Sequence, residues 1–348
     1  VRAQDFRFIY DSIKPTATVT YPSNDFSTNT LVVGGSSLTI TGDSNDLGVG
    51  VSTVMVSIGK NSADVGSACY NPTAKTFSAT CPLWFSAGGS PGSWNVSAVA
   101  WNSASGGDGR YYILARASDS ADNSQTLFNT AVSSITFLYD RTGPTVALTD
   151  PSEAGGWDRI SSHMPILGTA SDSGSGKIAK VEIRVRRVTA TAAWWKPAIL
   201  GGGSLESFSL GDDDAGASSA WFPVNPTAAN WTSWNLSSAA AMDVGAGLDI
   251  ETGKQYQIIA RASDTANNWT TVYSTVTIVF DNLAPVSVST LPAEGTYAGV
   301  NALPQIRGTL TDNATGAGPN PGTVTCVKVR LRRLSDGFWW DHLGITPT

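Results

Sequence analysis

The chain has 348 residues, of which 41% are hydrophobic and only 14% are charged, and its formal net charge is −6. This length exceeds what one hydrophobic core usually serves, so two or three domains are expected. The acidic balance and the lack of a basic stripe argue against nucleic acid as a partner. No apolar run is long enough for a membrane-spanning helix.

Three sequence motifs recur along the chain in the same order. The first is an apolar strand followed by Asp, three residues and Pro. The second is a strand that leads into a turn with Gly and Asp, and the third is an alternating strand, rich in Arg in its last two copies. The copies are "FIYDSIKP", "FLYDRTGP" and "IVFDNLAP" at 8–15, 137–144 and 278–285; "LTITGDSND", "PILGTASDSGSG" and "PQIRGTLTDNATGAG" at 38–46, 165–176 and 304–318; and "STVMVSI", "AKVEIRVRRV" and "CVKVRLRRL" at 52–58, 179–188 and 326–334.

A nonapeptide also occurs twice, as "ARASDSADN" at 115–123 and "ARASDTANN" at 260–268. The residues before and within it alternate with period 2, which predicts a strand with one apolar face. The inward positions are Tyr111, Ile113, Ala115 and Ala117 in the first copy, and Tyr256, Ile258, Ala260 and Ala262 in the second. Each copy therefore predicts the penultimate strand of a domain and the turn into its last strand.

Many short strands with turn signals, and no sustained helical period, predict an all-β protein of tandem Ig-like antiparallel β-sandwiches. The repeats place two complete domains between partial ones. We expect residues 1–10 to be the last strand of a preceding repeat, 11–139 repeat one, 140–280 repeat two, and 281–348 the first half of a truncated repeat three. The Ala-rich stretch 237–247 predicts at most a short turn.

These motifs resemble the bacterial immunoglobulin-like and cadherin-like repeats of very large surface proteins. The shared pattern is D-x-x-x-P at the domain start, G-T-x-x-D at the second strand and Y-x-I-x-A-R-A-x-D-x-A-x-N near the end. The resemblance covers nearly the whole chain and implies modules of stalks, adhesins or filaments, or appendages to enzymes. Each repeat here is longer than the roughly 100 residues of a typical Ig domain and carries clustered tryptophans.

Nothing in the sequence favours catalysis. The two histidines, His163 and His342, stand in different repeats, and no nucleophile elbow, zinc-protease motif or phosphate loop occurs. Glu153 and Asp158 are the one carboxylate pair that suggests a glycosidase, but repeat one has no equivalent. We therefore expect a protein that is not an enzyme.

The repeated aspartates suggest Ca²⁺, because hard oxygen ligands in turns are what this ion prefers. A carboxylate that opens each domain can help one ion to link consecutive modules. The candidate ligands are Asp140, Asp281, Asp119, Asp264, Asn123, Asn268, Asp172 and Asp312. The alternative is that these residues only bond their own turn backbone. The acidic loop 211–218 is a further cation candidate or a solvated insertion.

Cysteines and tryptophans supply the remaining candidates. Cys69 and Cys81 bracket an expected hairpin, and a disulfide between them would indicate an oxidising compartment; two reduced cysteines are the alternative. Two Trp pairs follow the Arg-rich strands, and because neighbours on a strand face opposite ways, one ring of each pair should lie outside the core. The pairs are Trp194 with Trp195 and Trp339 with Trp340. Such rings can fill an enlarged core, anchor an interface or stack on a sugar.

Together these features predict an extracellular or cell-surface structural protein, built from modules that contact their neighbours or other copies of the chain. A carbohydrate-binding or adhesive module that binds surface glycans through exposed tryptophans is the alternative. We also considered that the N-terminal strand "DFRFIY" at 5–10 completes the C-terminal partial domain of another copy, although truncation explains both ends more simply.

Overall fold

The strands of the computed structural model carry the alternating sequences described above. The structure describes residues 7–33, 36–61, 68–101, 106–152, 158–160, 166–173, 176–188, 193–196, 207–210, 220–236, 252–281, 283–295, 305–312 and 324–340. Glu153, His163, His342, the acidic loop 211–218 and the stretch 237–247 lie outside these residues. None of the described segments forms a helix that is long and apolar enough to cross a membrane.

Two facing sheets enclose the first core. One has the strand order β1-β5-β11-β10, and the other has the order β2-β13-β12-β6-β7-β8, with β9 beside β6. Their strands are β1 (Thr16–Tyr21), β2 (Phe26–Thr28), β5 (Ile40–Asn45), β6 (Val51–Lys60), β7 (Ala68–Asn71), β8 (Thr76–Thr80), β9 (Phe85–Ser86), β10 (Gly88–Ser90), β11 (Ser93–Val96), β12 (Gly109–Asp119) and β13 (Ser134–Tyr139); β3 (Val32–Val33) and β4 (Ser36–Ser37) form a separate ribbon. We call this unit the first sandwich.

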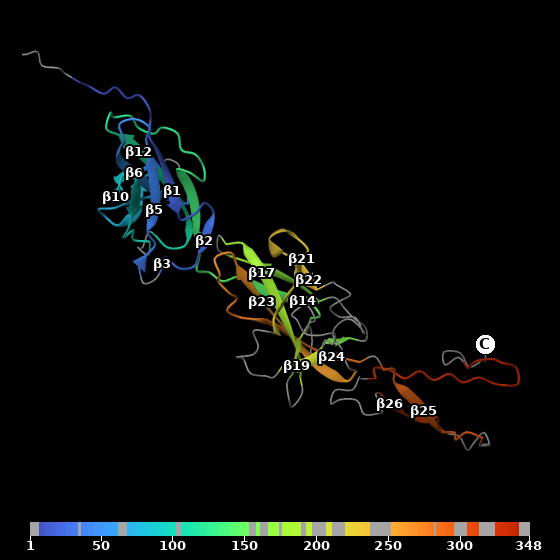
Figure 1. The fold of residues 1–348 in the computed structure, drawn as a ribbon. Coiled ribbons are helices and arrows are strands. Elements are labelled where there is room, and N and C mark those ends of the chain that lie inside the picture. The colour runs from blue at the N-terminus through green and yellow to red at the C-terminus, as the bar shows by residue number, and fades with distance from the viewer. Residues whose placement is uncertain are drawn as a thin grey trace, which may run out of the picture.

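The second sandwich repeats the arrangement with the orders β14-β16-β22-β21 and β15-β24-β23-β17-β18-β19, and with β20 beside β17. Its elements are β14 (Thr145–Asp150), β15 (Asp158–Ile160), β16 (Ile166–Ser171), β17 (Ile178–Arg187), β18 (Ala193–Lys196), β19 (Ser207–Leu210), β20 (Phe222–Pro223), β21 (Asn225–Pro226), the 3₁₀ turn η3 (Ala229–Trp231), β22 (Trp234–Leu236), β23 (Lys254–Asp264) and β24 (Ser274–Phe280). The two sandwiches and a third strand pair follow one another end to end (Figure 1).

The strand order is that of an immunoglobulin sandwich. In each unit one sheet corresponds to strands A-B-E-D, and the other contains the G-F-C order. The first strand also divides, because β2 and β15 cross over to pair in parallel with β13 and β24. The predicted all-β tandem sandwich is therefore confirmed.

Period-2 patterning forms both cores. Along β12, buried and half-buried residues alternate without a break, and Tyr111, Ile113, Ala115 and Ala117 are fully buried, as predicted. The matching residues of β23 line the second core. These faces would be solvated if the register slipped by one residue, so the apolar pattern fixes the pairing.

A glycine beneath a tryptophan is repeated in each sandwich. An added Cβ on Gly42 would lie 2.1 Å from Trp94 Cζ2, and one on Gly168 would lie 2.0 Å from Trp234 Cζ2. Both indole rings are almost completely buried. The second motif therefore requires Gly at this position, because the Trp of β11 or β22 packs directly against its Cα.

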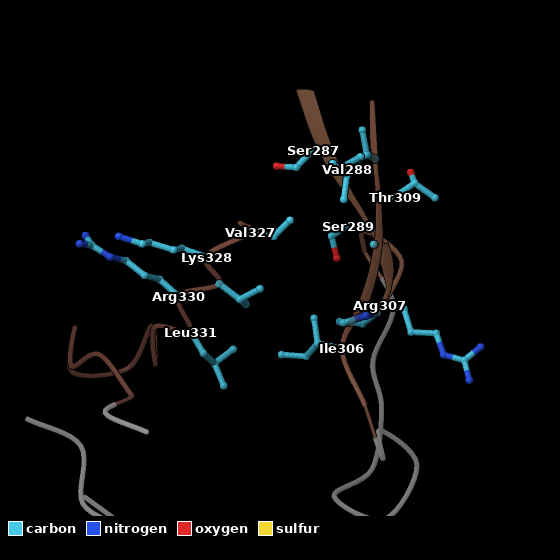
Figure 2. A pocket seen from close by; sticks show the side chains of 14 residues that line it. Ser287, Val288, Ser289, Ile306, Arg307, Thr309, Val327, Lys328, Arg330 and Leu331 are labelled. Atoms are coloured by element: carbon cyan, nitrogen blue, oxygen red, sulfur yellow. The ribbon is translucent and has the colours of Figure 1, made fainter. Parts of the chain in front are cut away.

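The third strand pair consists of β25 (Val286–Leu291) and β26 (Arg307–Thr311). With residues 327–331 it lines a cavity of about 590 Å³, into which Ile306, Val327 and Leu331 project while Lys328 and Arg330 point away (Figure 2). By motif alignment the inward residues match Ile166, Val181 and Val185, which are buried in the second sandwich. The cavity thus has the residue pattern of a sandwich core rather than that of a ligand site.

Candidate metal centres

Three aspartates meet at one end of each sandwich. Asp cluster 1 consists of Asp11, Asp46 and Asp119, and Asp cluster 2 consists of Asp140, Asp172 and Asp264. Within each cluster, one carboxylate oxygen per residue lies within 4.8 Å of the others. The members come from the same three places in the fold: the D-x-x-x-P segment, the turn between the second and third motifs, and the end of the penultimate strand.

The repeated nonapeptide forms the turn that holds each cluster. In the second sandwich, Asp264 Oδ1 accepts bonds from the backbone N–H groups of Ala266 and Asn268, both at 2.8 Å. The Asn268 side-chain amide donates to Asp264 Oδ2 at 2.7 Å and to the carbonyl oxygen of Asp140 at 2.8 Å. The Asn at the end of the motif therefore ties the turn to the first residue of the D-x-x-x-P segment.

The first sandwich has the same bonds. Asn123 donates to Asp119 Oδ2 at 2.8 Å and to the Asp11 carbonyl at 3.0 Å. Burial opposes the charged form of Asp119, but the bonds from Asn123 and Ala121 outweigh this effect and lower the pKa of Asp119 below its ordinary value. Asp119 is therefore held as a carboxylate, which is the form that a cation needs.

Asp cluster 2 contains a carboxylate oxygen that lacks a hydrogen-bond partner among the described residues. Asp140 is only 1% exposed, and its Oδ2 accepts no hydrogen bond from the described residues, whereas its Oδ1 accepts one from Thr142 N–H at 2.9 Å. A buried, unsatisfied carboxylate oxygen is costly, and close carboxylates repel one another. A bound cation would relieve both effects.

Gly176 shows how closely the oxygens of Asp cluster 2 converge. A Cβ built on this residue would lie 2.6 Å from Oδ2 of Asp140, 2.6 Å from Oδ2 of Asp172 and 3.4 Å from Oδ2 of Asp264. All three Oδ2 atoms thus face the same small space, which only a residue without a side chain leaves open. Carboxylate oxygens that converge in this way suit Ca²⁺, which takes oxygen ligands at about 2.3–2.6 Å.

Asp cluster 1 is more fully satisfied by the backbone. Asp11 accepts bonds from Ile13 N–H and Val49 N–H, each at 2.8 Å. Asp46 Oδ2 accepts from Gly48 and Gly50, while its Oδ1 has no partner among the described residues. Turn chemistry alone therefore accounts for more of this cluster than of Asp cluster 2.

The structure groups the candidate ligands by sandwich. Asp119 meets Asp11 rather than Asp140, and Asn123 and Asn268 use their amide nitrogens on neighbouring oxygens. Asp281 and Asp312 belong to no three-acid group of the described residues. Asp11 and Asp46 were missing from the candidate ligands, although their motif positions match those of Asp140 and Asp172.

Trp194 and Trp195 face opposite ways, as predicted for neighbours on a strand. Trp195 is in the second core, and Trp194 packs outside it with Trp221 and Ile259. Both rings of this pair are buried, because other side chains cover Trp194 on the outer side of the sheet. Neither ring therefore offers a free face to a sugar. Trp339 and Trp340 are exposed.

The two sandwiches meet without an intervening linker. Asp140 N–H donates to the Thr28 carbonyl of the first sandwich at 3.0 Å, while its side chain belongs to Asp cluster 2. Arg141 Nε donates to Asp108 Oδ1 at 2.8 Å, and this bond is the main cause of the raised pKa of Arg141. Lys177 and Thr265 line a 430 Å³ cavity together with five residues of the first sandwich.

No protein-family model and no curated protein matches the sequence. Among solved structures, the chain is similar to the tetra-tandem repeat in the extending region of a large adhesion protein, with 15% identity and a TM-score of 0.27, over 81% of this chain and 53% of that one. It is also similar to the native conformation of the E. coli alpha-2-macroglobulin, with 7% identity and a TM-score of 0.24, over 87% of this chain and 16% of that one. The chain thus spans about half of the first structure and less of the second. The sandwich fold is defined by the sheets described above.

Proposed function

We propose that this chain is a non-catalytic segment of an extracellular or cell-surface stalk or filament, in which Ig-like modules stack end to end. The modules would be 11–139 and 140–280, followed by the start of another at 281, with residues up to 10 belonging to a preceding one. The observation that carries the proposal is the position of Asp140, whose N–H is bonded to the first sandwich and whose carbonyl is bonded to Asn268 of the second. A residue fixed from both sides leaves little freedom at the joint.

Asp cluster 2 would bind a divalent cation, for which Ca²⁺ is the best match to its carboxylate ligands. The ion would pair with the buried Oδ2 of Asp140 and so stiffen the joint, because the same residue connects the two sandwiches. Its partners would be the adjacent modules of the same chain or neighbouring copies of it. The disulfide between Cys69 and Cys81 supports an oxidising, extracellular setting.

The experiment is thermal unfolding of the full chain with excess Ca²⁺ and with EDTA. A ligand present at a hundred times its Kd stabilises the folded state by about 2.7 kcal/mol, so we expect Ca²⁺ to raise the Tm of the second sandwich by several degrees. Asp140→Asn should abolish this shift, whereas Asp122→Asn, which removes one exposed charge outside the clusters, should retain it. Equal Tm values with Ca²⁺ and EDTA would leave the aspartates as turn residues alone.

A further inference from the structure

The two sandwiches place different chemistry at the same position of the sheet. Gly59 of β6 pairs with Cys69 of β7, and Arg186 of β17 pairs with Trp194 of β18. The two strand pairs are equivalent, because Ile58 pairs with Ile113 just as Val185 pairs with Ile258. Cys69 and Trp194 therefore occupy corresponding sites.

The next residue along each strand confirms the equivalence. Tyr70 and Trp195 both enter the core, where each meets the phenylalanine of the strand beside β6 or β17 in an edge-to-face contact. The ring centroids are 6.0 Å apart for Tyr70 and Phe85, and 4.8 Å apart for Trp195 and Phe222. The inward side of this hairpin is thus the same in both sandwiches, and only the outward side differs.

In the second sandwich, stacked side chains hold the outward side. The Arg184 guanidinium lies 4.1 Å from the ring centroid of Trp194 and 4.6 Å from that of Trp221. The Arg261 guanidinium lies 4.1 Å from the ring centroid of Trp221. Ile259 is buried in the same cluster as Trp194 and Trp221. Cation–π contacts of this kind attract a guanidinium to the face of an indole ring. They connect β17, β18, β23 and the segment before β20.

The third repeat has the same motif. Arg330 and Arg332, which match Arg184 and Arg186, lie 5.8 and 5.6 Å from the ring centroid of Trp339. Trp339 matches Trp194 in the sequence repeat. Among the described residues, an Arg–Trp stack therefore occurs at this position in two of the repeats.

In the first sandwich a disulfide occupies this position. Ser57 stands where the second sandwich has Arg184, and its Oγ lies 3.6 Å from Cys69 Sγ. Cys69 is bonded to Cys81, which follows β8, so the disulfide closes the base of the β7–β8 hairpin. The second Arg–Trp contact is present in both sandwiches, because Arg116 stacks on Trp84 at 4.4 Å as Arg261 stacks on Trp221.

We propose that the Cys69–Cys81 disulfide replaces the Arg–Trp stack as the clasp of this edge hairpin, which makes the first sandwich, and not the second, sensitive to reduction. Among the described residues, β7 pairs with β6 through two residue pairs, Gly59 with Cys69 and Lys60 with Ala68. A dithiol reductant would transfer two electrons to the S–S bond, giving two protein thiols and the oxidised cyclic disulfide of the reductant. The hairpin then loses its covalent closure and opens more often.

The test uses the full chain with Cys326→Ser, which removes the exposed free thiol. We expect dithiothreitol to increase amide hydrogen exchange in 68–80 and to lower the Tm of the first sandwich by about 10 °C, while exchange in 193–196 stays unchanged. Trp194→Ala should increase exchange in the second sandwich to the same extent with and without the reductant. Trp194→Phe, which keeps an aromatic face, should have the smaller effect.

A second variant separates loss of the disulfide from other effects of the reductant. Cys69→Ser with Cys81→Ser should reproduce the exchange pattern of the reduced protein and should not respond to dithiothreitol. The proposal is overturned if the native protein shows free thiols at both positions by mass spectrometry. It is also overturned if reduction leaves 68–80 unchanged or affects both sandwiches equally.

Discussion

The identity of two glycines in this chain is determined by the tryptophan rings that pack against them. Gly42 and Gly168 have no backbone conformation that excludes other residues, yet each supports an indole ring at a distance that leaves no room for a methyl group. Trp94 Nε1–H also donates to the Asp43 carbonyl at 3.1 Å, which fixes the ring over the strand. The glycine and the tryptophan therefore act as one packing unit.

We expect Gly42→Ala to destabilise the first sandwich by about 3 kcal/mol, because the new methyl group would have to displace the Trp94 ring or the β1 backbone. Urea denaturation measures this loss as a lower midpoint. Gly92→Ala is the matched control, since nothing lies within 4 Å of its added Cβ, and it should change stability by less than about 1 kcal/mol. Equal effects of the two substitutions would contradict the packing argument.

At the scale of the element, the turn between β23 and β24 holds the start of its own module in place. Asn268 makes two side-chain bonds, one to the turn carboxylate and one to the backbone of Asp140. This arrangement explains why the nonapeptide recurs as a unit, with Asp and Asn four residues apart in both copies. The Asp shapes the turn, and the Asn attaches it to the joint.

Asn268→Ala should lower the free energy of unfolding of the second sandwich by about 2 kcal/mol, since it removes both bonds and leaves the Asp140 carbonyl without this donor. Hydrogen exchange at 140–143 should rise in the variant. The control is Thr265→Ala in the same turn, where the side chain is exposed. Unchanged exchange at 140–143 in Asn268→Ala would show that this turn does not hold the joint.

At the scale of the whole molecule, direct contact between sandwiches sets the shape. Arg141, in the second copy of the D-x-x-x-P motif, pairs with Asp108 of the first sandwich. Its guanidinium also lies 5.3 Å from the ring centroid of Tyr139. Both charged side chains are partly exposed, so this ion pair contributes little to the stability of either sandwich. Its effect should be on orientation instead.

Arg141→Ala should therefore change the Tm by little, corresponding to less than about 1 kcal/mol, but it should broaden the distribution of interdomain distances. Small-angle X-ray scattering, or distance measurements between labels on the two sandwiches, would detect this change. Arg7→Ala removes the same charge from an exposed N-terminal residue and should leave the distribution unaltered. A large fall in Tm without a change in distances would contradict the assigned role.

The sequence by itself determined the strands and their inward faces. Period-2 alternation identified Tyr111 and Ile113 as core residues, and the order of the repeated motifs indicated tandem sandwiches. These features are local: apolar alternation and turn residues act on near neighbours in the chain. The sequence also shows that Asp11 and Asp140 are equivalent, because they occupy the same position of the D-x-x-x-P motif.

Only the tertiary structure decided which of the repeated residues meet. Asp119 joins Asp11, 108 positions away (119 − 11), rather than Asp140 close by in the sequence, because the turns at one end of a sandwich converge only once the strand order is set. Likewise, Trp194 is buried by Arg184 and Trp221, which come from other strands. Such contacts depend on which sheet faces are covered, and a covering layer from distant segments leaves no periodic signal in the strand that it covers.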